Sequence, residues 1–410
     1  MTPSEDEQFS VWLHDRLVAR LLRRGDTTRF VFDPDYLADP SRPLLGLRLE
    51  EEPLRRCRAH LRLPPWFSNL LPEGQLRQWV ADARGTSTER EMELLAHVGH
   101  DLPGAVRVIP SLERIAVDDD VDSDSDPSLQ SSAAASMWSF SLAGVALKFS
   151  MLATGERLTI PAIGENGDWI VKLPDPQYPH VPRNEFAMMA LARAIGIDVP
   201  ETRLVHRESV ESLPEQAWSS GETHAYAVRR FDRGPGQARV HIEDLAQVRG
   251  FYPEQKYEGS FETVAALLYR GRDIEALREF TRRLVFNTLI GNGDAHLKNW
   301  SLIYRDPRQP TISPAYDLVA TAVYRPGTLG PEDLGLKLRG SRRFDTVHLG
   351  AFTALERLLK AKTALEDVAR EVVRLTNERW DQIAPILEPV PELAQSIRGW
   401  LAERSRQLTR

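Results

Sequence analysis

Three polar residues in the C-terminal half of the chain have the types and the order that phosphoryl transfer requires. Asp294 and Asn299 lie in the segment Gly291-Asn-Gly-Asp-Ala-His-Leu-Lys-Asn299, at the interval of the aspartate and asparagine in a kinase catalytic loop. The carboxylate accepts or steers the proton of an attacking hydroxyl, and the amide oxygen holds Mg²⁺ on the phosphates. Asp317, in Pro314-Ala-Tyr-Asp317, follows eighteen residues after Asn299 and supplies a second metal-binding acid. Gly-Asn-Gly alone is ordinary turn chemistry, but a turn does not explain the three residues in this order.

A kinase also needs a lysine on a strand to hold the phosphates and a glutamate on the next helix to orient it. Lys172 lies at the end of a predicted strand, and Glu185 lies in the first turn of the helix predicted after it. Each residue has a plainer interpretation. A lysine at a strand end is often a solvated cap, and the helix dipole favours an acid near a helix N-terminus.

A loop that cradles phosphate through its backbone N–H groups is expected further upstream. The segment Ser139-Phe-Ser-Leu-Ala-Gly-Val-Ala-Leu-Lys148 occupies that position. It contains one glycine, so it does not match a GxGxxG loop. By itself it predicts a strand with a bend at Gly144.

The elements that must position these residues change in type along the chain. Runs rich in β-branched and aromatic residues predict strands at residues 29–32, 44–49, 138–148, 168–173, 225–231 and 300–304. Helical periodicity predicts helices at residues 73–83, 88–97, 184–195, 261–268, 273–289, 348–359, 364–378 and 392–405, with Asn184 as the N-cap of the third. A hairpin is expected through residues 306–310. Strands come first and helices later, which predicts an α+β fold with two lobes that meet near Phe231.

Composition and charge limit the domain plan and the partners. The 410 residues are 42% hydrophobic and 27% charged, with a net charge of -7, so bulk electrostatic binding to DNA is not expected. The lone cysteine, Cys57, excludes an internal disulfide. Six aspartates crowd into residues 118–126 before a Ser/Ala stretch, which predicts a solvated linker rather than a calcium loop. We predict an N-terminal subdomain (1–116), a linker (117–136), a kinase N-lobe (137–232) and a helical C-lobe (233–410).

Several segments together resemble the HipA family of serine/threonine kinase toxins. The matching segments are Leu70-Leu-Pro-Glu-Gly74, Asp101-Leu-Pro-Gly-Ala105, Ser141-Leu-Ala-Gly-Val-Ala-Leu-Lys-Phe149, Asp168-Trp-Ile-Val-Lys172, Asn184-Glu-Phe186, Arg230-Phe-Asp-Arg233, Gly291 to Asn299 and Pro314-Ala-Tyr-Asp317. The resemblance implies a two-lobed protein-kinase-like fold and phosphorylation of protein serine or threonine, with ATP and Mg²⁺. In the family the known substrates are aminoacyl-tRNA synthetases.

The resemblance also implies roles for single residues. Asp294 would be the catalytic base, Asn299 and Asp317 would bind Mg²⁺, and Lys172 would contact the α- and β-phosphates. The phosphate loop would be Ala143, Gly144, Val145, Ala146, Leu147 and Lys148. The hinge that receives adenine would include Arg229, Arg230 and Phe231. His296 and Lys298 would reach the nucleotide or the transferring phosphate. Ser141, with Ser139 as a second candidate, would be the serine on which the kinase phosphorylates itself.

Two departures from the family pattern concern nucleotide affinity. The family loop usually reads Gly-Val-Gln-Pro-Lys, whereas this chain has Ala146 and Leu147 at the third and fourth positions. The hinge position that often carries an acid is Arg229. The family also implies a HipB-like helix-turn-helix antitoxin that would bring DNA only indirectly. We expect a cytoplasmic location and no membrane partner.

Two other functions are compatible with parts of this pattern. A small-molecule phosphotransferase of the aminoglycoside or choline kinase type shares the Gly-Asp-x-His-x-x-Asn loop and the two lobes. A catalytically inert kinase-fold corepressor would need neither a base nor metal ligands. The altered loop at Ala146 and Leu147 is the sequence feature that favours the inert module.

Overall fold

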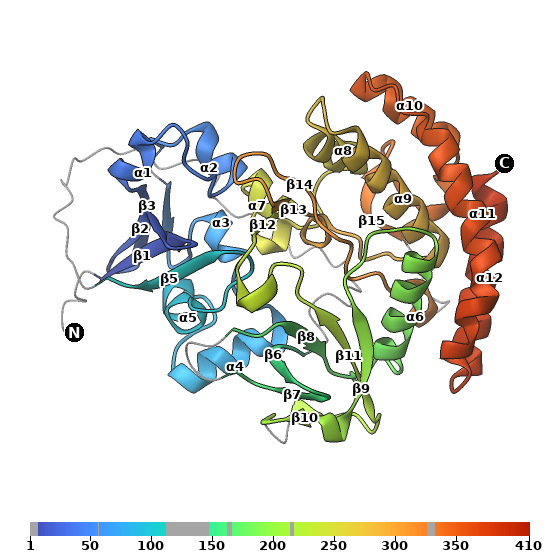
Figure 1. Ribbon diagram of the computed structural model, residues 1–410, viewed down its shortest axis with the longest axis horizontal. Helices are drawn as coiled ribbons and strands as arrows, with labels where there is room; N and C mark the ends of the chain where they lie inside the picture. The colour runs from blue at the N-terminus through green and yellow to red at the C-terminus, as the bar shows by residue number, and fades with distance from the viewer. Residues whose placement is uncertain (1–6, 56, 112–146, 162–165, 214–216, 326–332) are drawn as a thin grey trace.

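The computed structural model describes residues 7–55, 57–111, 147–161, 166–213, 217–325 and 333–410. They form an α+β structure with an N-terminal sheet, a second sheet, and a large helical lobe that adjoins both (Figure 1). The predicted linker and most of the predicted phosphate loop lie outside the described residues.

The N-terminal subdomain is an antiparallel sheet covered by short helices. Its strand order is β4-β3-β2-β1-β5, and its strands are β1 (Glu7–Leu13), β2 (Arg16–Arg24), β3 (Thr27–Phe32), β4 (Cys57–His60) and β5 (Val106–Pro110). Its helices are α1 (Pro34–Ala38), α2 (Leu47–Glu51), α3 (Pro65–Ser68), α4 (Gly74–Arg84) and α5 (Glu91–Val98). Alternate residues of β3 are buried, as expected for a strand with one face on a core.

The strand predicted at residues 44–49 is wrong, because helix α2 begins there. A Cβ atom on Gly46 would lie 2.4 Å from the Trp66 ring nitrogen, so only glycine allows the chain to pass this close to the indole. The five residues that follow are leucine, arginine and glutamate, which favour helix over strand.

The second sheet has the order β10-β7-β6-β8-β11-β9. Its strands are β6 (Lys148–Thr154), β7 (Arg157–Thr159), β8 (Trp169–Lys172), β9 (Thr202–His206), β10 (Val210–Glu211) and β11 (His224–Arg229). Helix α6 (Val181–Ala194) lies beside β9 and β11 (Figure 1). Strand β8 lies between β6 and β11, so Lys172 is opposite Lys148 on one side and Tyr226 on the other.

Asn184 is not the N-cap of its helix, because α6 already begins at Val181 with a proline in its first turn. Asn184 is instead completely buried. Its amide donates to the carbonyl of Ala320 (3.1 Å) and its oxygen accepts from the amide of Ala320 (3.1 Å). It thereby joins α6 to the segment that follows Asp317.

We expect Asn184→Ala to lower the free energy of unfolding by about 1–3 kcal/mol, because the buried amide and carbonyl of Ala320 lose their partner. Urea denaturation of the purified protein measures this. Asn377→Ala is the control, since Asn377 lies on an outer helix and bonds a carbonyl of its own helix and Ser405. A loss no larger than in this control would contradict the role given to Asn184.

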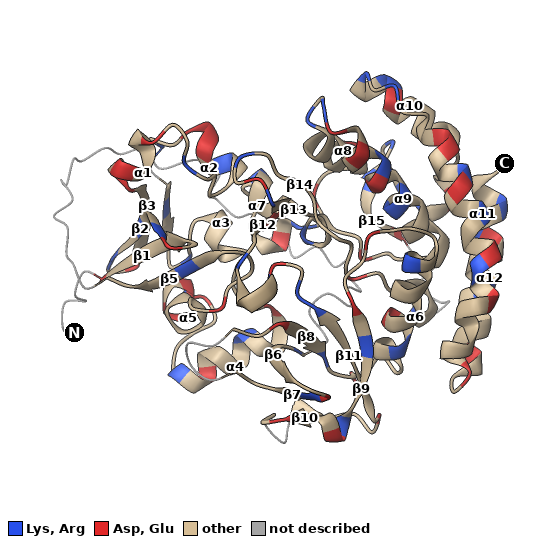
Figure 2. Cartoon of the chain, viewed as in Figure 1, with Lys and Arg blue, Asp and Glu red and all other residues tan. Residues whose placement is uncertain are grey.

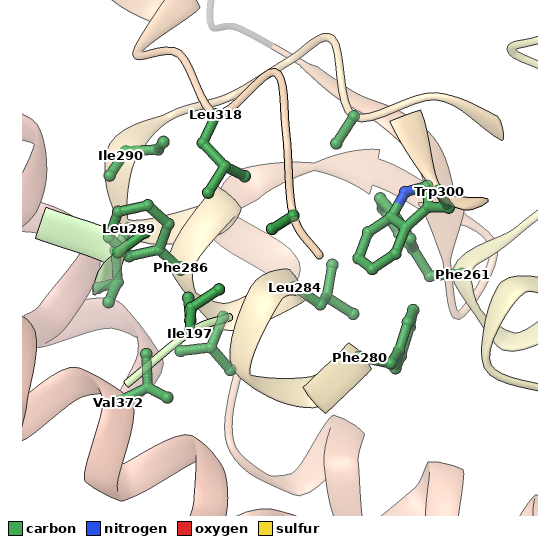
Figure 3. Packing of buried hydrophobic residues seen from close by; sticks show 14 of the residues in the cluster. Ile197, Phe261, Phe280, Leu284, Phe286, Leu289, Ile290, Trp300, Leu318 and Val372 are labelled. Carbon is green, nitrogen blue, oxygen red and sulfur yellow. The ribbon is translucent and has the colours of Figure 1, made fainter. Parts of the chain in front are cut away.

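The helical lobe is built around α9. Its helices are α7 (Leu245–Arg249), α8 (Phe261–Tyr269), α9 (Ile274–Ile290), α10 (Gly350–Leu359), α11 (Leu365–Ile383) and α12 (Pro391–Leu408). Its strands are β12 (His241–Asp244), β13 (Ser301–Tyr304), β14 (Thr311–Ile312), β15 (Asp333–Leu338) and β16 (Ser341–Arg343). The predicted hairpin is confirmed as β13–β14. Figure 3 shows Phe280, Leu284 and Phe286 of α9 within the apolar cluster that also contains Trp300.

The outer helices expose a mixed charged surface. Figure 2 shows basic and acidic residues interspersed on α11 and α12, and several form ion pairs one turn apart, such as Arg374 with Glu378. In the part of the chain that the structure describes, no helix combines the length and apolar character needed to cross a bilayer.

Candidate active site

The catalytic loop begins where α9 ends. Gly291 terminates the helix with a φ of 68°, and a Cβ atom there would lie 2.8 Å from that of Ala322. Asn292 then fixes the loop, because its side-chain Nδ2 donates to the side-chain oxygen of Asn287 (2.8 Å) and to the backbone carbonyl of Asp317 (3.1 Å). One asparagine therefore joins the helix end, the loop and the second acid.

Asp294 is held through its main chain and its side chain. Its amide donates to the Asn292 side-chain oxygen (3.1 Å), and its carbonyl accepts from Asn299 Nδ2 (2.8 Å). The short helix η6 (Leu297–Asn299) brings Asn299 back toward Asp294. The carboxylate accepts a hydrogen bond from the Tyr257 hydroxyl (2.5 Å). The Asp294 side chain is 11% exposed, so it is shielded but within reach of a substrate.

Asp317 forms an ion pair with Lys172 across the seam between the second sheet and the helical lobe. The Lys172 ammonium also contacts Glu185 Oε1 at 2.7 Å, so the predicted strand lysine and helix glutamate do meet. Glu185 lies in the second turn of α6, since the helix begins earlier than predicted. Asp317 has a φ of 57°, a conformation that aspartate and asparagine tolerate better than most residues. Such outliers are common at functional sites.

Burial and neighbouring charge set the protonation of this triad. Burial opposes the charge on Lys172, but the two carboxylates raise its pKa above the ordinary value. Burial likewise opposes ionisation of Asp317, yet the Lys172 ammonium lowers the pKa of Asp317 below its ordinary value. Burial raises the pKa of Glu185 to about 7 despite Lys172, and the charge of Asp317 adds to the rise. Lys172 and Asp317 are therefore both charged at neutral pH.

A cleft joins these groups. It contains about 830 Å³ of space, part of it open to solvent, and its walls come from all three parts of the chain. The lining residues are Pro72, Glu73, Leu76, Lys148, Lys172, Leu173, Val181, Pro182, Glu185, Asn292, Asp294, Asp317, Val319 and Thr321. Asn299 and Asp317 also line a smaller hollow of about 240 Å³ that shares Asn292 and Asp317 with the cleft. Asp294, Asn299 and Asp317, the three residues that predicted phosphoryl transfer, therefore lie together.

The donor set suits Mg²⁺. One carboxylate and one amide oxygen, from Asp317 and Asn299, are hard oxygen ligands, and Mg²⁺ is usually held by one or two such groups together with substrate phosphates. Lys148 and Lys172 place positive charge on the cleft wall, where a polyphosphate would need it. The residues present therefore fit Mg²⁺ and a nucleotide.

His296 and Lys298 lie in the loop but differ in their surroundings. His296 is 2% exposed, and neither ring nitrogen has a hydrogen-bond partner among the described residues. Burial, together with the charge of Lys256, lowers the pKa of His296 to about 3, so the ring is neutral at pH 7. The ammonium of Lys298 instead contacts Asn69 (2.9 Å), Asp244 (3.1 Å) and Glu73 (3.4 Å).

Glu73 is a site residue that sequence reasoning missed. It belongs to the family-like segment Leu70-Leu-Pro-Glu-Gly74, from which no role was predicted for it. In the structure it lines the cleft and pairs with Lys256 (2.8 Å) and Lys298. Burial opposes its ionisation, but these lysines lower the pKa of Glu73 to about 2. Asn292, Lys256 and Tyr257 were also missed. The sequence around residues 256–257 has no motif, so only the fold reveals these two.

The predicted hinge residues do not line the cleft. Arg229 is more than half exposed and pairs with Glu201 (3.4 Å). The Arg230 guanidinium is buried and forms ion pairs with Asp101 (3.0 Å) and Asp232 (2.8 Å). Because these internal pairs occupy its side chain, only the backbone of Arg230 is available to contact adenine. The ring of Phe231 lies 5.7 Å from that of Tyr316. Adenine binding at these residues stays a prediction.

The predicted phosphate loop is described only at its end. Leu147 is buried and Lys148 lines the cleft as the first residue of β6. Ala143, Gly144, Val145 and Ala146 lie outside the described residues, as do the autophosphorylation candidates Ser139 and Ser141.

Comparisons with known proteins point to one family. The family model for the HipA-like C-terminal domain matches residues 140–380, and that for the HipA N-terminal domain matches residues 9–109. "Putative kinase Y4dM" of Sinorhizobium fredii is 45% identical over 381 residues, which cover 88% of this chain and 90% of the relative. "Serine/threonine-protein kinase toxin HipA" of Shewanella oneidensis is 29% identical over 296 residues, which cover 62% of each.

A solved structure shares the fold. HipA of Shewanella oneidensis MR-1, in a complex with HipB and operator DNA, superimposes with a TM-score of 0.76 at 22% identity, over 98% of this chain and 97% of that one. The fold is therefore the α+β, two-lobed, kinase-like fold that the sequence predicted. With both domain models matched in order along its length, the chain belongs to the HipA family.

Proposed function

We propose that this chain is an ATP- and Mg²⁺-dependent protein serine/threonine kinase of the HipA type. The observation that carries the proposal is the meeting of Asp294, Asp317 and the Lys172–Glu185 pair in one cleft, with Asn299 beside them. A chain that only bound a partner would have no need of a shielded base and a cation in the same cleft.

The residues divide the work of phosphoryl transfer between them. Lys172, held by Glu185, binds the α- and β-phosphates. Asn299 and Asp317 would hold Mg²⁺, which would neutralise charge that develops on the phosphates. Asp294 receives the proton of the acceptor hydroxyl as that oxygen bonds to the γ-phosphorus. The bond between the γ-phosphorus and the β–γ bridging oxygen breaks, and ADP leaves.

The finer features of the proposal rest on family membership. The proposed substrate is a component of translation, an aminoacyl-tRNA synthetase. Ser141 or Ser139 is the proposed autophosphorylation site, and the proposed location of the protein is the cytoplasm. A HipB-like antitoxin is the proposed partner, supported by the HipB-bound HipA that shares the fold. With a net charge of -7, this chain would depend on such a partner for a basic surface that meets DNA.

Labelling with γ-³²P-ATP tests the proposal. We expect the purified chain to label protein serine in the presence of Mg²⁺, and EDTA to abolish the labelling because Asp317 and Asn299 lose the ion they hold. Phosphoproteomics after induction, with Asp294→Asn as control, then identifies the target. Label on aminoglycosides or choline instead of protein would favour a small-molecule phosphotransferase. The absence of both labelling and a thermal shift with Mg·ATP would favour the inert module.

A further inference from the structure

The carboxylate of Asp294 accepts a hydrogen bond from a tyrosine that lies in no recognised motif. Tyr257 lies between the short helix η5 (Pro253–Gln255) and α8, and its hydroxyl is 2.5 Å from Asp294 Oδ1. The rings of Tyr257 and His296 meet edge-on with 5.1 Å between their centroids. A phenol O–H thus reaches the carboxylate to which the proposed reaction delivers a proton.

The position of Tyr257 is set by contacts other than the one with Asp294. Arg342 of β16 donates to the carbonyl of Tyr257, and the amide of Leu297 donates to the carbonyl of Lys256 (3.0 Å). The neighbouring strand β15 packs directly on the loop, because a Cβ atom on Gly335 would lie 2.8 Å from the Ala295 backbone. The hydroxyl is therefore presented to Asp294 by a frame built from the backbone.

The hydrogen bond from Tyr257 acts on the side chain of Asp294, whereas the two loop asparagines hold its main chain. Asn292 bonds the backbone amide of Asp294 and Asn299 its backbone carbonyl, and the Tyr257 hydroxyl acts on the two side-chain torsions. A donor on one carboxylate oxygen fixes these torsions.

We propose that Tyr257 is a positioning residue for phosphoryl transfer, whose hydroxyl holds the Asp294 carboxylate in its reactive orientation. The inference rests on the proposed kinase function and adds a residue to its machinery. A hydrogen bond to a charged group is worth enough that its loss is expected to lower kcat by about 10- to 100-fold.

The test is Tyr257→Phe in the purified full-length chain, which removes one oxygen and keeps the ring. We expect kcat to fall by about 10- to 100-fold while the Kd for Mg·ATP changes less than about twofold. Tyr269→Phe is the matched control, since Tyr269 is packed in the core of the same lobe, and it should leave kcat unchanged.

A double-mutant cycle separates positioning from packing. In an Asp294→Asn background, Tyr257→Phe should cost less than about a further twofold, because the carboxylate it serves is gone. A residue that only packed the lobe would lower kcat equally in both backgrounds. Incorporation of 3,5-difluorotyrosine at position 257 keeps the fold and acidifies the phenol. The alkaline limb of the kcat–pH profile should then move to lower pH, as the donated proton is lost earlier.

The outcomes distinguish this inference from the function on which it rests. Wild-type kcat in Tyr257→Phe, with an active parent, would overturn the role of Tyr257 and leave the kinase proposal standing. A rise in kcat would also overturn it, by showing that the hydroxyl occupies the place of the acceptor. A parent chain that transfers no phosphate would overturn both.

Discussion

Replacing Asp317 by asparagine is expected to lower phosphoryl transfer by about a thousandfold or more, a loss of about 4 kcal/mol of transition-state stabilisation. Asp317 is both the proposed ligand of Mg²⁺ and the partner of Lys172, so the change removes charge from the metal site and frees the lysine. Asparagine tolerates the positive φ of this position, so the backbone can keep its course. Calorimetry should show weaker binding of Mg·ATP together with the loss of kcat.

A matched control for Asp317→Asn is available on the surface. Asp345 pairs with Arg343 at an exposed position, and Asp345→Asn should leave both binding and kcat unchanged. Mg·ATP affinity equal to wild type in Asp317→Asn would remove this residue from the metal site.

Asp294→Asn is expected to lower kcat by about 100- to 10,000-fold, the range for loss of a general base, while Mg·ATP binding is nearly unchanged. The amide keeps the size of the side chain and can still meet Tyr257, but it cannot take the proton of the acceptor. Single-turnover transfer and equilibrium binding, measured on the same preparation, provide the two quantities.

The two variants are most informative as a pair. Asp317→Asn should weaken binding and chemistry together, and Asp294→Asn should affect chemistry alone. If Asp294→Asn lost nucleotide affinity as strongly as Asp317→Asn does, the assignment of separate base and metal-ligand roles would be wrong.

The parts of the site that depend on short sequence intervals were predictable. Asp294 and Asn299 lie in one loop, and the hairpin that brings Asp317 back to them could be inferred from the residues between. Lys172 and Glu185 are joined by a strand and the next helix, and their contact follows from that order. The helices around the site were also placed well, since α8 and α9 begin within a residue of their predicted starts.

The contacts that cross the fold were not predictable. Tyr257 and Glu73 meet the catalytic loop only because distant segments pack against it, and no local pattern encodes such a meeting. Asparagine is a residue type that favours the N-cap position, but the side chain of Asn184 instead bonds the buried backbone carbonyl and N–H of Ala320. The helix accordingly begins one turn earlier, at Val181.

A crystal structure with Mn²⁺ and a non-hydrolysable ATP analogue tests the central claim most directly. We predict an anomalous peak about 2.1 Å from Asn299 Oδ1 and from a carboxylate oxygen of Asp317, the distance of a small octahedral cation. The γ-phosphate should lie between this ion and Asp294. A nucleotide bound elsewhere, or an ion that touches neither Asn299 nor Asp317, would contradict the account.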